Sequence, residues 1–187
     1  TVWAVLRKAP PLPFLPPEIH GSEILILACL FAGDVQDGEK ALAPLRTFGR
    51  PAADVIRPRS YLDFQSAFDP FLQAGQRNYW KSHYFRQLDD GLFEAVLPLM
   101  RGVPNQSCEV LVAHLGGAVG RIPEDATAYP HRDARFLLNV HGRWHDPSQD
   151  DVGRAWTREV FRAAEPYAAG GVYANFMSGE EEGRVRA

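Results

Sequence analysis

The chain has 187 residues, 45% of them hydrophobic and 23% charged, which is typical of one folded domain with an apolar core and excludes a long disordered tail. The formal net charge is −3 and no basic run is present, so we expect no nucleic-acid partner. The longest apolar run, residues 24–32, is shorter than the roughly 20 residues of a membrane-spanning helix, so we expect no membrane partner. Only Cys29 and Cys108 are present, too few for a disulfide framework, which favours a reducing, cytoplasmic location.

The N-terminal part of the chain predicts two strands and one capped helix. Residues 2–6 have a strand pattern, so we expect the chain to begin inside a structural unit, and the proline-rich residues 10–17 predict a rigid connector. Residues 24–31 are continuously apolar, which favours a strand covered on both faces, although a buried helix has the same pattern. Asp34 can accept hydrogen bonds from the free N–H groups of the next turn, and apolar residues follow at helical spacing until Gly49.

The middle of the chain alternates between helices and strands. Ser60 resembles the first residue of a capping box and predicts a short helix that ends at Asp69. Residues 78–84 are rich in aromatic side chains and predict a strand. Asp90 begins a helix that Gly102 closes.

Two strands and a helix follow, and one of these strands has a clear two-faced pattern. We expect strands at residues 108–114 and 138–145, a helix at 152–167 and an extended segment at 172–176. In the strand at 138–145, one face is apolar, and the other is expected to be wet or functional because it carries Asn139, His141, Arg143 and His145. The whole pattern predicts an α+β fold, with a mixed, largely antiparallel sheet and helices packed on one face.

The familiar sequence signatures of nucleotide-binding and hydrolytic sites are absent, and so is a metal site. His141 and His145 share one face of a strand, but they would lie roughly 13 Å apart at the normal strand rise. Because that is too far for one ion, we predict no bound metal.

Four groups of residues can carry chemistry, and each also has a purely structural interpretation. Trp80, Lys81 and His83 could bind an aromatic ligand, or they could belong to a half-buried edge strand. Arg132 could hold a carboxylate or phosphate, or it could form a salt bridge with Asp133 or Glu124.

His114 could act as an acid or base beside two glycines, or it could be an ordinary core histidine. Tyr173 and Asn175 should point to the same side, where a phenol and an amide could bind a heteroaromatic ring.

Taken in order, several motifs resemble the C-terminal half of the berberine bridge enzyme-like FAD-linked oxidases, in the vanillyl-alcohol-oxidase-like flavoprotein superfamily. The motifs are Ala43-Pro44-Leu45-Arg46 with Phe48-Gly49, Tyr79-Trp80-Lys81-Ser82, Leu115-Gly116-Gly117, Pro130-His131-Arg132 and Gly171-Val172-Tyr173-Ala174-Asn175-Phe176. The resemblance implies a substrate-binding domain at residues 1–168 and a segment at 169–187 that approaches the flavin. It also implies that FAD is held by another domain of the same polypeptide, so we expect this chain to be truncated at both ends.

The resemblance further implies roles for individual residues. Tyr173 would act as the base, with His114 as a second catalytic candidate, and the cofactor contacts would come from Tyr173, Asn175, His131 and Arg132. The substrate-binding residues would be Trp80, Lys81, His83, Asn139, His141 and Arg143. A small alcohol, sugar or aromatic substrate would lose a proton, and its hydride would pass to the flavin.

The chain departs from the family pattern on the strand before Gly116. Several relatives carry a carboxylate there, whereas this chain has Leu111, Val112 and Ala113. The nearest ionisable residues are Glu109 and His114, which should face opposite sides of the sheet.

The competing hypothesis is a stand-alone α+β module without catalytic activity, which would bind a ligand or form a dimer through the exposed face of its sheet. The polar residues expected on that face suit a lined pocket better than a dry dimer interface. A homodimer through another surface stays open in both hypotheses.

Overall fold

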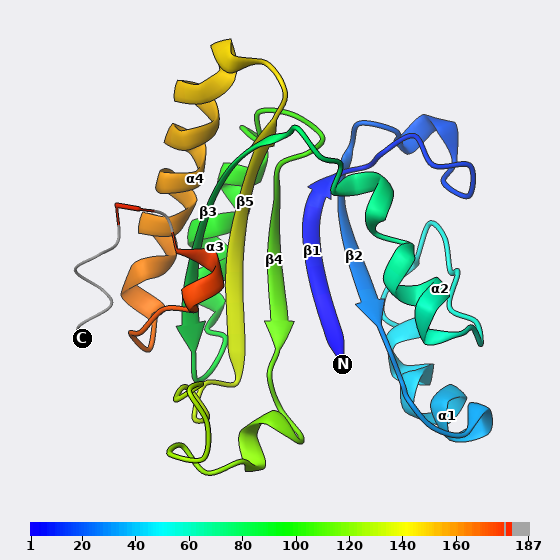
Figure 1. Cartoon of the computed structure of the whole chain (residues 1–187). Helices are drawn as coiled ribbons and strands as arrows, with labels where there is room; N and C mark the ends of the chain where they lie inside the picture. The colour runs from blue at the N-terminus through cyan, green and yellow to red at the C-terminus, as the bar shows by residue number, and fades with distance from the viewer. Residues whose placement is uncertain (178, 181–187) are drawn as a thin grey trace.

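The computed structural model describes residues 1–177, 179 and 180, and a five-stranded sheet organises this part of the chain (Figure 1). The strand order is β2-β1-β4-β5-β3, and each neighbouring pair is antiparallel. The strands are β1 (Val2–Lys8), β2 (Glu23–Cys29), β3 (Arg77–Phe85), β4 (Glu109–His114) and β5 (Phe136–Trp144). The predicted α+β class and largely antiparallel sheet are therefore confirmed.

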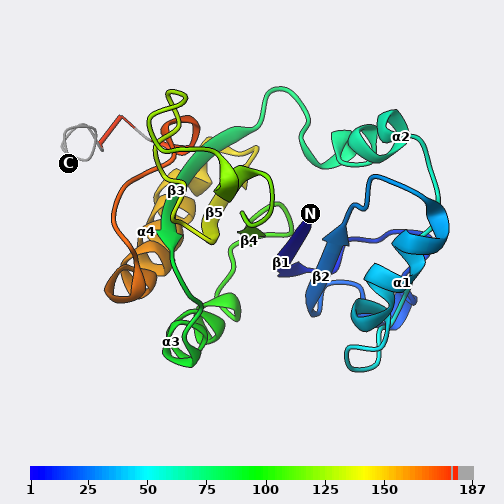
Figure 2. The same cartoon turned by 90° about the horizontal axis from the view of Figure 1, so that it is seen from below.

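Two helices, α3 (Asp90–Met100) and α4 (Asp150–Ala164), lie on one face of the sheet (Figure 2). We call this the helix face. It contributes Val110 and Val140 to the main core, which also holds Trp156 from α4. We call the opposite side the polar face, because it carries Glu109, Asn139, His141 and Arg143, which alternate with core residues along β4 and β5.

Helix α4 approaches β5 closely because one of its residues has no side chain. A Cβ atom on Gly153 would lie 2.4 Å from Cζ3 of Trp144, so a larger residue would push the helix away from the strand. The indole of Trp156 donates a hydrogen bond of 3.1 Å to Leu99 O, which links α4 to α3. This close packing buries the predicted apolar face of β5.

The other two helices, α1 (Val35–Arg46) and α2 (Tyr61–Ser66), lie beyond β2 at the far side of the sheet (Figure 2). Both predicted caps are present. Asp34 Oδ1 accepts from Gln36 N at 2.8 Å, and Ser60 Oγ accepts from Asp63 N at 3.1 Å. Local sequence was therefore sufficient to locate the start of each helix.

Strand β2 differs from its prediction. It is an edge strand, none of its residues is buried by the described part of the chain, and Leu25 is 48% exposed. The expectation of cover on both faces is wrong for these residues. An apolar run indicates that a strand tends to be buried, but it does not show which parts of the protein pack against each face.

The segment after α4 also differs from its prediction. Residues 172–176 were expected to be extended, but Ala174–Phe176 forms one turn of 3-10 helix, in which Phe176 N donates to Tyr173 O at 2.9 Å. Residues 178 and 181–187 of the predicted flavin-approaching segment lie outside the described residues.

Short 3-10 helices complete the described structure, and no helix in it is long and apolar enough to cross a membrane. Besides Ala174–Phe176, the 3-10 helices are Pro17–Ile19, Asp69–Phe71, Val119–Arg121, Pro147–Gln149 and Glu165–Tyr167. The cytoplasmic location stays a prediction.

Candidate functional site

A large concavity of about 2210 Å³ lies on the polar face of the sheet. Its lining comes from β1, β2, β4 and β5, from α1 and α2, and from the segments that carry Tyr129 and Tyr173. Ligand pockets usually measure roughly 300–1,000 Å³. The concavity therefore has room for more than one small ligand, or for a ligand together with another part of the protein.

Aromatic side chains form one end of this concavity. The rings of Tyr129 and Tyr173 are 6.1 Å apart, those of Tyr173 and Phe176 are 4.9 Å apart, and both pairs meet edge to face. Phe176 also lies 5.6 Å from Trp80 on β3. We call Tyr84, Tyr129, Tyr173 and Phe176 the aromatic wall, because the four pack in one cluster beside the polar face.

Tyr173 and Asn175, which the sequence predicted to point to the same side, are in contact, although the segment is a helical turn and not extended. The Asn175 amide donates a hydrogen bond of 2.9 Å to the Tyr173 phenol oxygen. Tyr173 is half buried and lines the concavity. Because its oxygen accepts from the amide, the phenol proton is available to donate to a ligand.

His131 lies against the aromatic wall and fixes the backbone before Tyr173. Its ring is 4.5 Å from the ring of Tyr84. On the other side, a Cβ atom on Gly171 would lie 2.4 Å from His131 Cε1, and Gly171 has a φ of 70°. Only glycine combines this backbone conformation with so close an approach to the imidazole.

The Arg132 side chain mainly contacts groups of its own loop. Its Nη1 donates to Val119 O at 3.2 Å, its Nη2 donates to Thr127 Oγ1 at 2.5 Å, and its guanidinium lies 4.7 Å from the centre of the Tyr129 ring. Asp133, offered from the sequence as an alternative partner, instead accepts from Arg86. The proposed contact of Arg132 with a cofactor stays a prediction.

A buried group of charged residues occupies the other end of the polar face. Glu109 Oε2 accepts from Arg7 Nη1 at 2.8 Å, and Glu109 Oε1 accepts from Arg143 Nη2 at 2.6 Å. Nδ1 of His141 lies 3.0 Å from the same Oε1 atom. We call these four residues, which all line the concavity, the Glu109 cluster.

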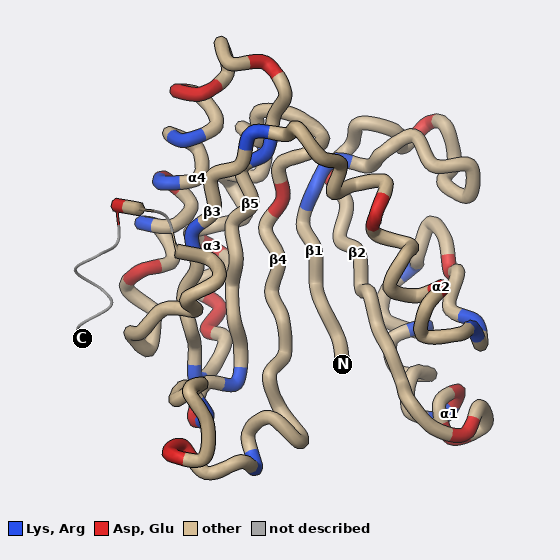
Figure 3. The backbone as a smooth tube through the Cα atoms, in the orientation of Figure 1, with Lys and Arg blue, Asp and Glu red and all other residues tan. Residues whose placement is uncertain are grey.

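The register of the sheet brings the Glu109 cluster together. Arg7 on β1 and His141 on β5 are the direct cross-strand partners of Glu109 on β4. Figure 3 shows an acidic position on β4 beside a basic one on β1 at the same end of the sheet, while the middle of both strands carries no charge. Three strands therefore contribute charges to one buried point.

The charges in this cluster influence one another strongly. Burial by itself would raise the pKa of Glu109, but the hydrogen bond from His141 and the charges of Arg143 and Arg7 outweigh burial and lower it. Burial is also the main cause that lowers the pKa of Arg7. Glu109 is therefore a carboxylate at neutral pH, held between two guanidinium groups.

Asn139, His141 and Arg143 share one face, as the sequence predicted, but that face is not wet. Asn139 is fully buried, and its Nδ2 lies 2.6 Å from His141 Nε2. The His141 ring stacks on Trp80, with 4.6 Å between ring centres. Of the two alternatives offered by the sequence, the wet face is therefore wrong for these three residues: Trp80 and Phe176 pack against His141, while α3 and α4 cover the opposite face of the sheet.

Lys81 and His83 lie on the helix face, so the structure separates them from Trp80. Lys81 Nζ is 5.0 Å from the centre of the Phe161 ring, and the His83 ring stacks on Phe161 at 3.9 Å. The reason is the alternation of side chains along β3, which sends neighbours in the aromatic segment to opposite faces. These two residues pack under α4 and do not line the concavity.

His114 and Tyr173 are not brought together either. His114 is exposed at the end of β4, and its ring lies 5.3 Å from Phe136 on the helix face. Tyr173 packs beside the polar face. As predicted, Glu109 and His114 point to opposite sides of the sheet.

Sequence reasoning missed the central role of Glu109 and did not single out Arg7. From the sequence, Glu109 is only an ionisable group near the Gly116-Gly117 turn. The available signal was the charge itself, because Arg7 and Glu109 each occupy a strand that is otherwise largely apolar.

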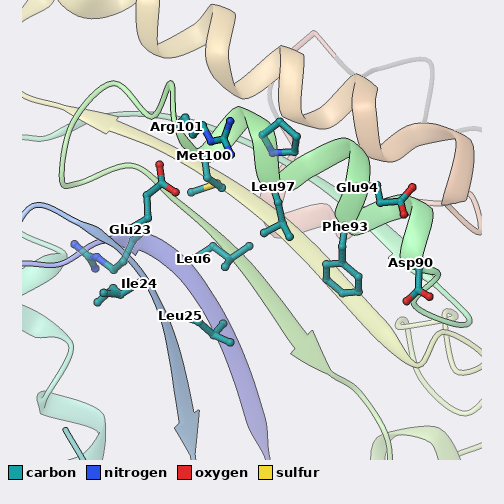
Figure 4. Close-up of a pocket in the computed structure, with 12 residues that line it drawn as sticks. Leu6, Glu23, Ile24, Leu25, Asp90, Phe93, Glu94, Leu97, Met100 and Arg101 are labelled. Carbon is teal, nitrogen blue, oxygen red and sulfur yellow. The ribbon is translucent and has the colours of Figure 1, made fainter. Parts of the chain in front are cut away.

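A second, smaller hollow of about 710 Å³ lies on the helix face, between α3 and the β1–β2 pair (Figure 4). Leu6, Leu25 and Leu97 form part of its apolar lining, and Asp90 and Glu94 contribute acidic groups. None of the residues predicted for the site lines this hollow. The described residues also contain no group of three or more possible metal ligands.

Comparison with known proteins shows which larger proteins this chain resembles, although no family model matches it. An FAD-linked oxidoreductase of Dictyostelium discoideum is 24% identical over 162 residues, which cover 85% of this chain and 35% of that protein. The aclacinomycin-N/aclacinomycin-A oxidase of Streptomyces galilaeus is 41% identical over 54 residues, which cover 29% of this chain and 10% of the oxidase.

A solved structure shares the fold of this chain. Berberine bridge enzyme from Eschscholzia californica superposes with a TM-score of 0.73 at 14% identity, over 95% of this chain and 37% of the enzyme. The predicted resemblance to berberine bridge enzyme-like FAD-linked oxidoreductases is confirmed. The chain spans about a third of the length of the Dictyostelium relative.

Proposed function

We propose that this chain is the substrate-binding part of a berberine bridge enzyme-like FAD-linked oxidoreductase, whose FAD-binding domain belongs to the same polypeptide. Residues 1–168 form the substrate-binding domain, and residues 169–187 carry Tyr173 toward the flavin. The observation that carries the proposal is the contact between Tyr173 and Asn175 at the edge of a concavity large enough for a flavin ring and a substrate.

The residues present fit a flavin. The aromatic wall offers flat apolar surfaces, and Asn175 and Tyr173 offer hydrogen-bonding groups to a heteroaromatic ring. In addition, the buried Trp80 Nε1 has no hydrogen-bond partner among the described residues, so a donor is available on the polar face. When bound, FAD would supply the chemistry of accepting a hydride from the substrate.

Tyr173 is the proposed base for a small alcohol, sugar or aromatic substrate. As a phenolate, it takes the proton from the substrate hydroxyl and becomes a phenol, and the amide of Asn175 holds the tyrosine oxygen in place by donating a hydrogen bond to it. Trp80, His141 and Arg143 lie on the face that holds the substrate. His114, Lys81 and His83 have no role in this proposal, because they lie on the helix face.

Tyr173→Phe in the complete protein tests the proposed base. It should slow flavin reduction by at least about 100-fold, since general base catalysis contributes roughly 10²–10⁴-fold. The measurement is anaerobic stopped-flow absorbance of the flavin, with Tyr61→Phe as the control because Tyr61 is 67% exposed on α2. An unchanged reduction rate in Tyr173→Phe would refute the role.

The mass and visible spectrum of the protein from its natural source test the larger proposal. We expect a yellow protein much heavier than the 20.9 kDa of this chain. A colourless protein of that mass, unable to take up FAD, would instead favour the stand-alone binding or dimerisation module. A homodimer stays a prediction in either case.

A further inference from the structure

The Glu109 cluster holds more positive than negative charge. It contains two guanidinium groups, from Arg7 and Arg143, and a single carboxylate. The other acceptors for these guanidiniums are the backbone oxygens of Lys8, Gln106 and Ser107, which carry no net charge. One positive charge is therefore left uncompensated by the cluster, at a place where burial makes an unbalanced charge costly.

Arg143 also has a donor group that is not used. Its Nε donates to Ser107 O at 3.0 Å and its Nη2 donates to Glu109, but its Nη1 has no hydrogen-bond partner among the described residues. The residue is only 1% exposed and yet lines the concavity. A buried guanidinium N–H without an acceptor is rare, because each such group costs free energy until it is paired.

The surroundings favour a flat ligand. His141 in the cluster lies 6.3 Å from Phe176 of the aromatic wall, and Leu111 and Leu137 line the concavity as well. A molecule in the concavity that lies across the wall and the cluster would contact aromatic and apolar groups along its body and a cation at its end.

We propose that the Glu109 cluster is an anion subsite, which binds the carboxylate of an aromatic substrate through Arg143. Glu109 keeps the two arginines in place, and the excess positive charge attracts the carboxylate. The proposal deepens the proposed function, on which it rests, by naming the substrate class as aromatic acids.

Binding of benzoate and benzamide to the complete protein tests this subsite. The two probes have the same shape, but only benzoate is charged. In isothermal titration calorimetry at low salt, benzoate should bind at least about tenfold more tightly than benzamide, because hydrogen bonds to charged groups are worth that much or more. Equal affinities would overturn the proposal.

Two variants test whether the Glu109 cluster causes the preference for benzoate over benzamide. Arg143→Gln should abolish the preference for benzoate. Arg86→Gln should keep it, because Arg86 is an exposed arginine just after the end of β3, whereas Arg143 pairs with Asn78 near the start of that strand. A preference that survives in Arg143→Gln would overturn the proposal. If Arg143→Gln does not fold, Arg143→Lys preserves the charge but not the forked donor, and it should bind benzoate several-fold more weakly than the wild type.

The outcomes also separate this inference from the proposed function. If benzoate and benzamide bind equally while Tyr173→Phe still slows flavin reduction, only the anion subsite is refuted. If benzoate is preferred but the complete protein carries no flavin, the subsite is supported and the oxidoreductase proposal fails.

Discussion

Glu109→Gln should destabilise the fold strongly, because Glu109 joins three strands through buried charged contacts. Its two oxygens accept from Arg7, Arg143 and His141 at distances between 2.6 and 3.0 Å. Glutamine has nearly the same shape, so the change removes the charge without opening a cavity. The expected effect therefore measures the electrostatic role of the carboxylate.

The magnitude follows from these contacts. The glutamine oxygen can still accept from one side of the cluster, but its NH₂ group then faces another donor and the two guanidiniums lose their counter-charge. Removing one partner from a buried ion pair costs about 3–5 kcal/mol, and we expect a loss in that range. This is a large part of the roughly 5–15 kcal/mol that stabilises a typical domain.

The pH dependence provides a second signature. The pKa of Glu109 lies below its ordinary value of 4.5 in the folded protein, because the His141 hydrogen bond and the neighbouring arginines outweigh burial. The Glu109 carboxylate therefore contributes its full stabilisation above about pH 4.5. This contribution is lost as the pH falls through the pKa that Glu109 has in the folded protein, which is lower than 4.5. The difference in unfolding free energy between wild type and Glu109→Gln should shrink over that range.

Urea unfolding of the complete protein, followed by tryptophan fluorescence between pH 7 and pH 3, measures both effects. Glu18→Gln is the control, because Glu18 is an exposed residue of a short 3-10 helix and should change the free energy by no more than about 0.5 kcal/mol. A loss below about 1 kcal/mol at pH 7 for Glu109→Gln, or a difference that does not vary with pH, would refute this reasoning.

Two further predictions concern packing. Leu138→Ala should cost about 2–5 kcal/mol in urea unfolding because Leu138 is 2% exposed in the main core, whereas Leu62→Ala should be nearly neutral because Leu62 is 71% exposed. Similar losses for both would contradict the described core. Gly171→Ala should slow flavin reduction and destabilise the protein more than Gly170→Ala, since both glycines have positive φ but only a Cβ at Gly171 meets His131. Equal effects in the two variants would show that His131 does not position the Tyr173 segment.

Local sequence was enough to predict most of the helices and strands and the two faces of β5. The caps at Asp34 and Ser60 act within one helical turn, so their effect can be read from neighbouring residues. The alternation from Leu138 onward likewise depends only on strand geometry. The contact between Tyr173 and Asn175 was also within reach, because the two residues are two positions apart.

The predictions that failed concern residues whose surroundings depend on segments far away in the sequence. Lys81 and His83 were grouped with Trp80 because they are adjacent in the chain, but alternation and the position of α4 put them on the other face. Strand β2 was expected to be covered on both sides, and its edge position became visible only from the order of the sheet.

By itself, the sequence determined the α+β class, the boundaries of most elements and the resemblance to FAD-linked oxidases, because propensity, capping and motifs are local properties. Only the tertiary structure decided how the strands are ordered and aligned. Arg7 and Glu109 are 102 positions apart, and no local pattern relates them. They meet because antiparallel pairing of β1 with β4 sets them opposite each other, and this pairing creates the buried charges of the candidate site.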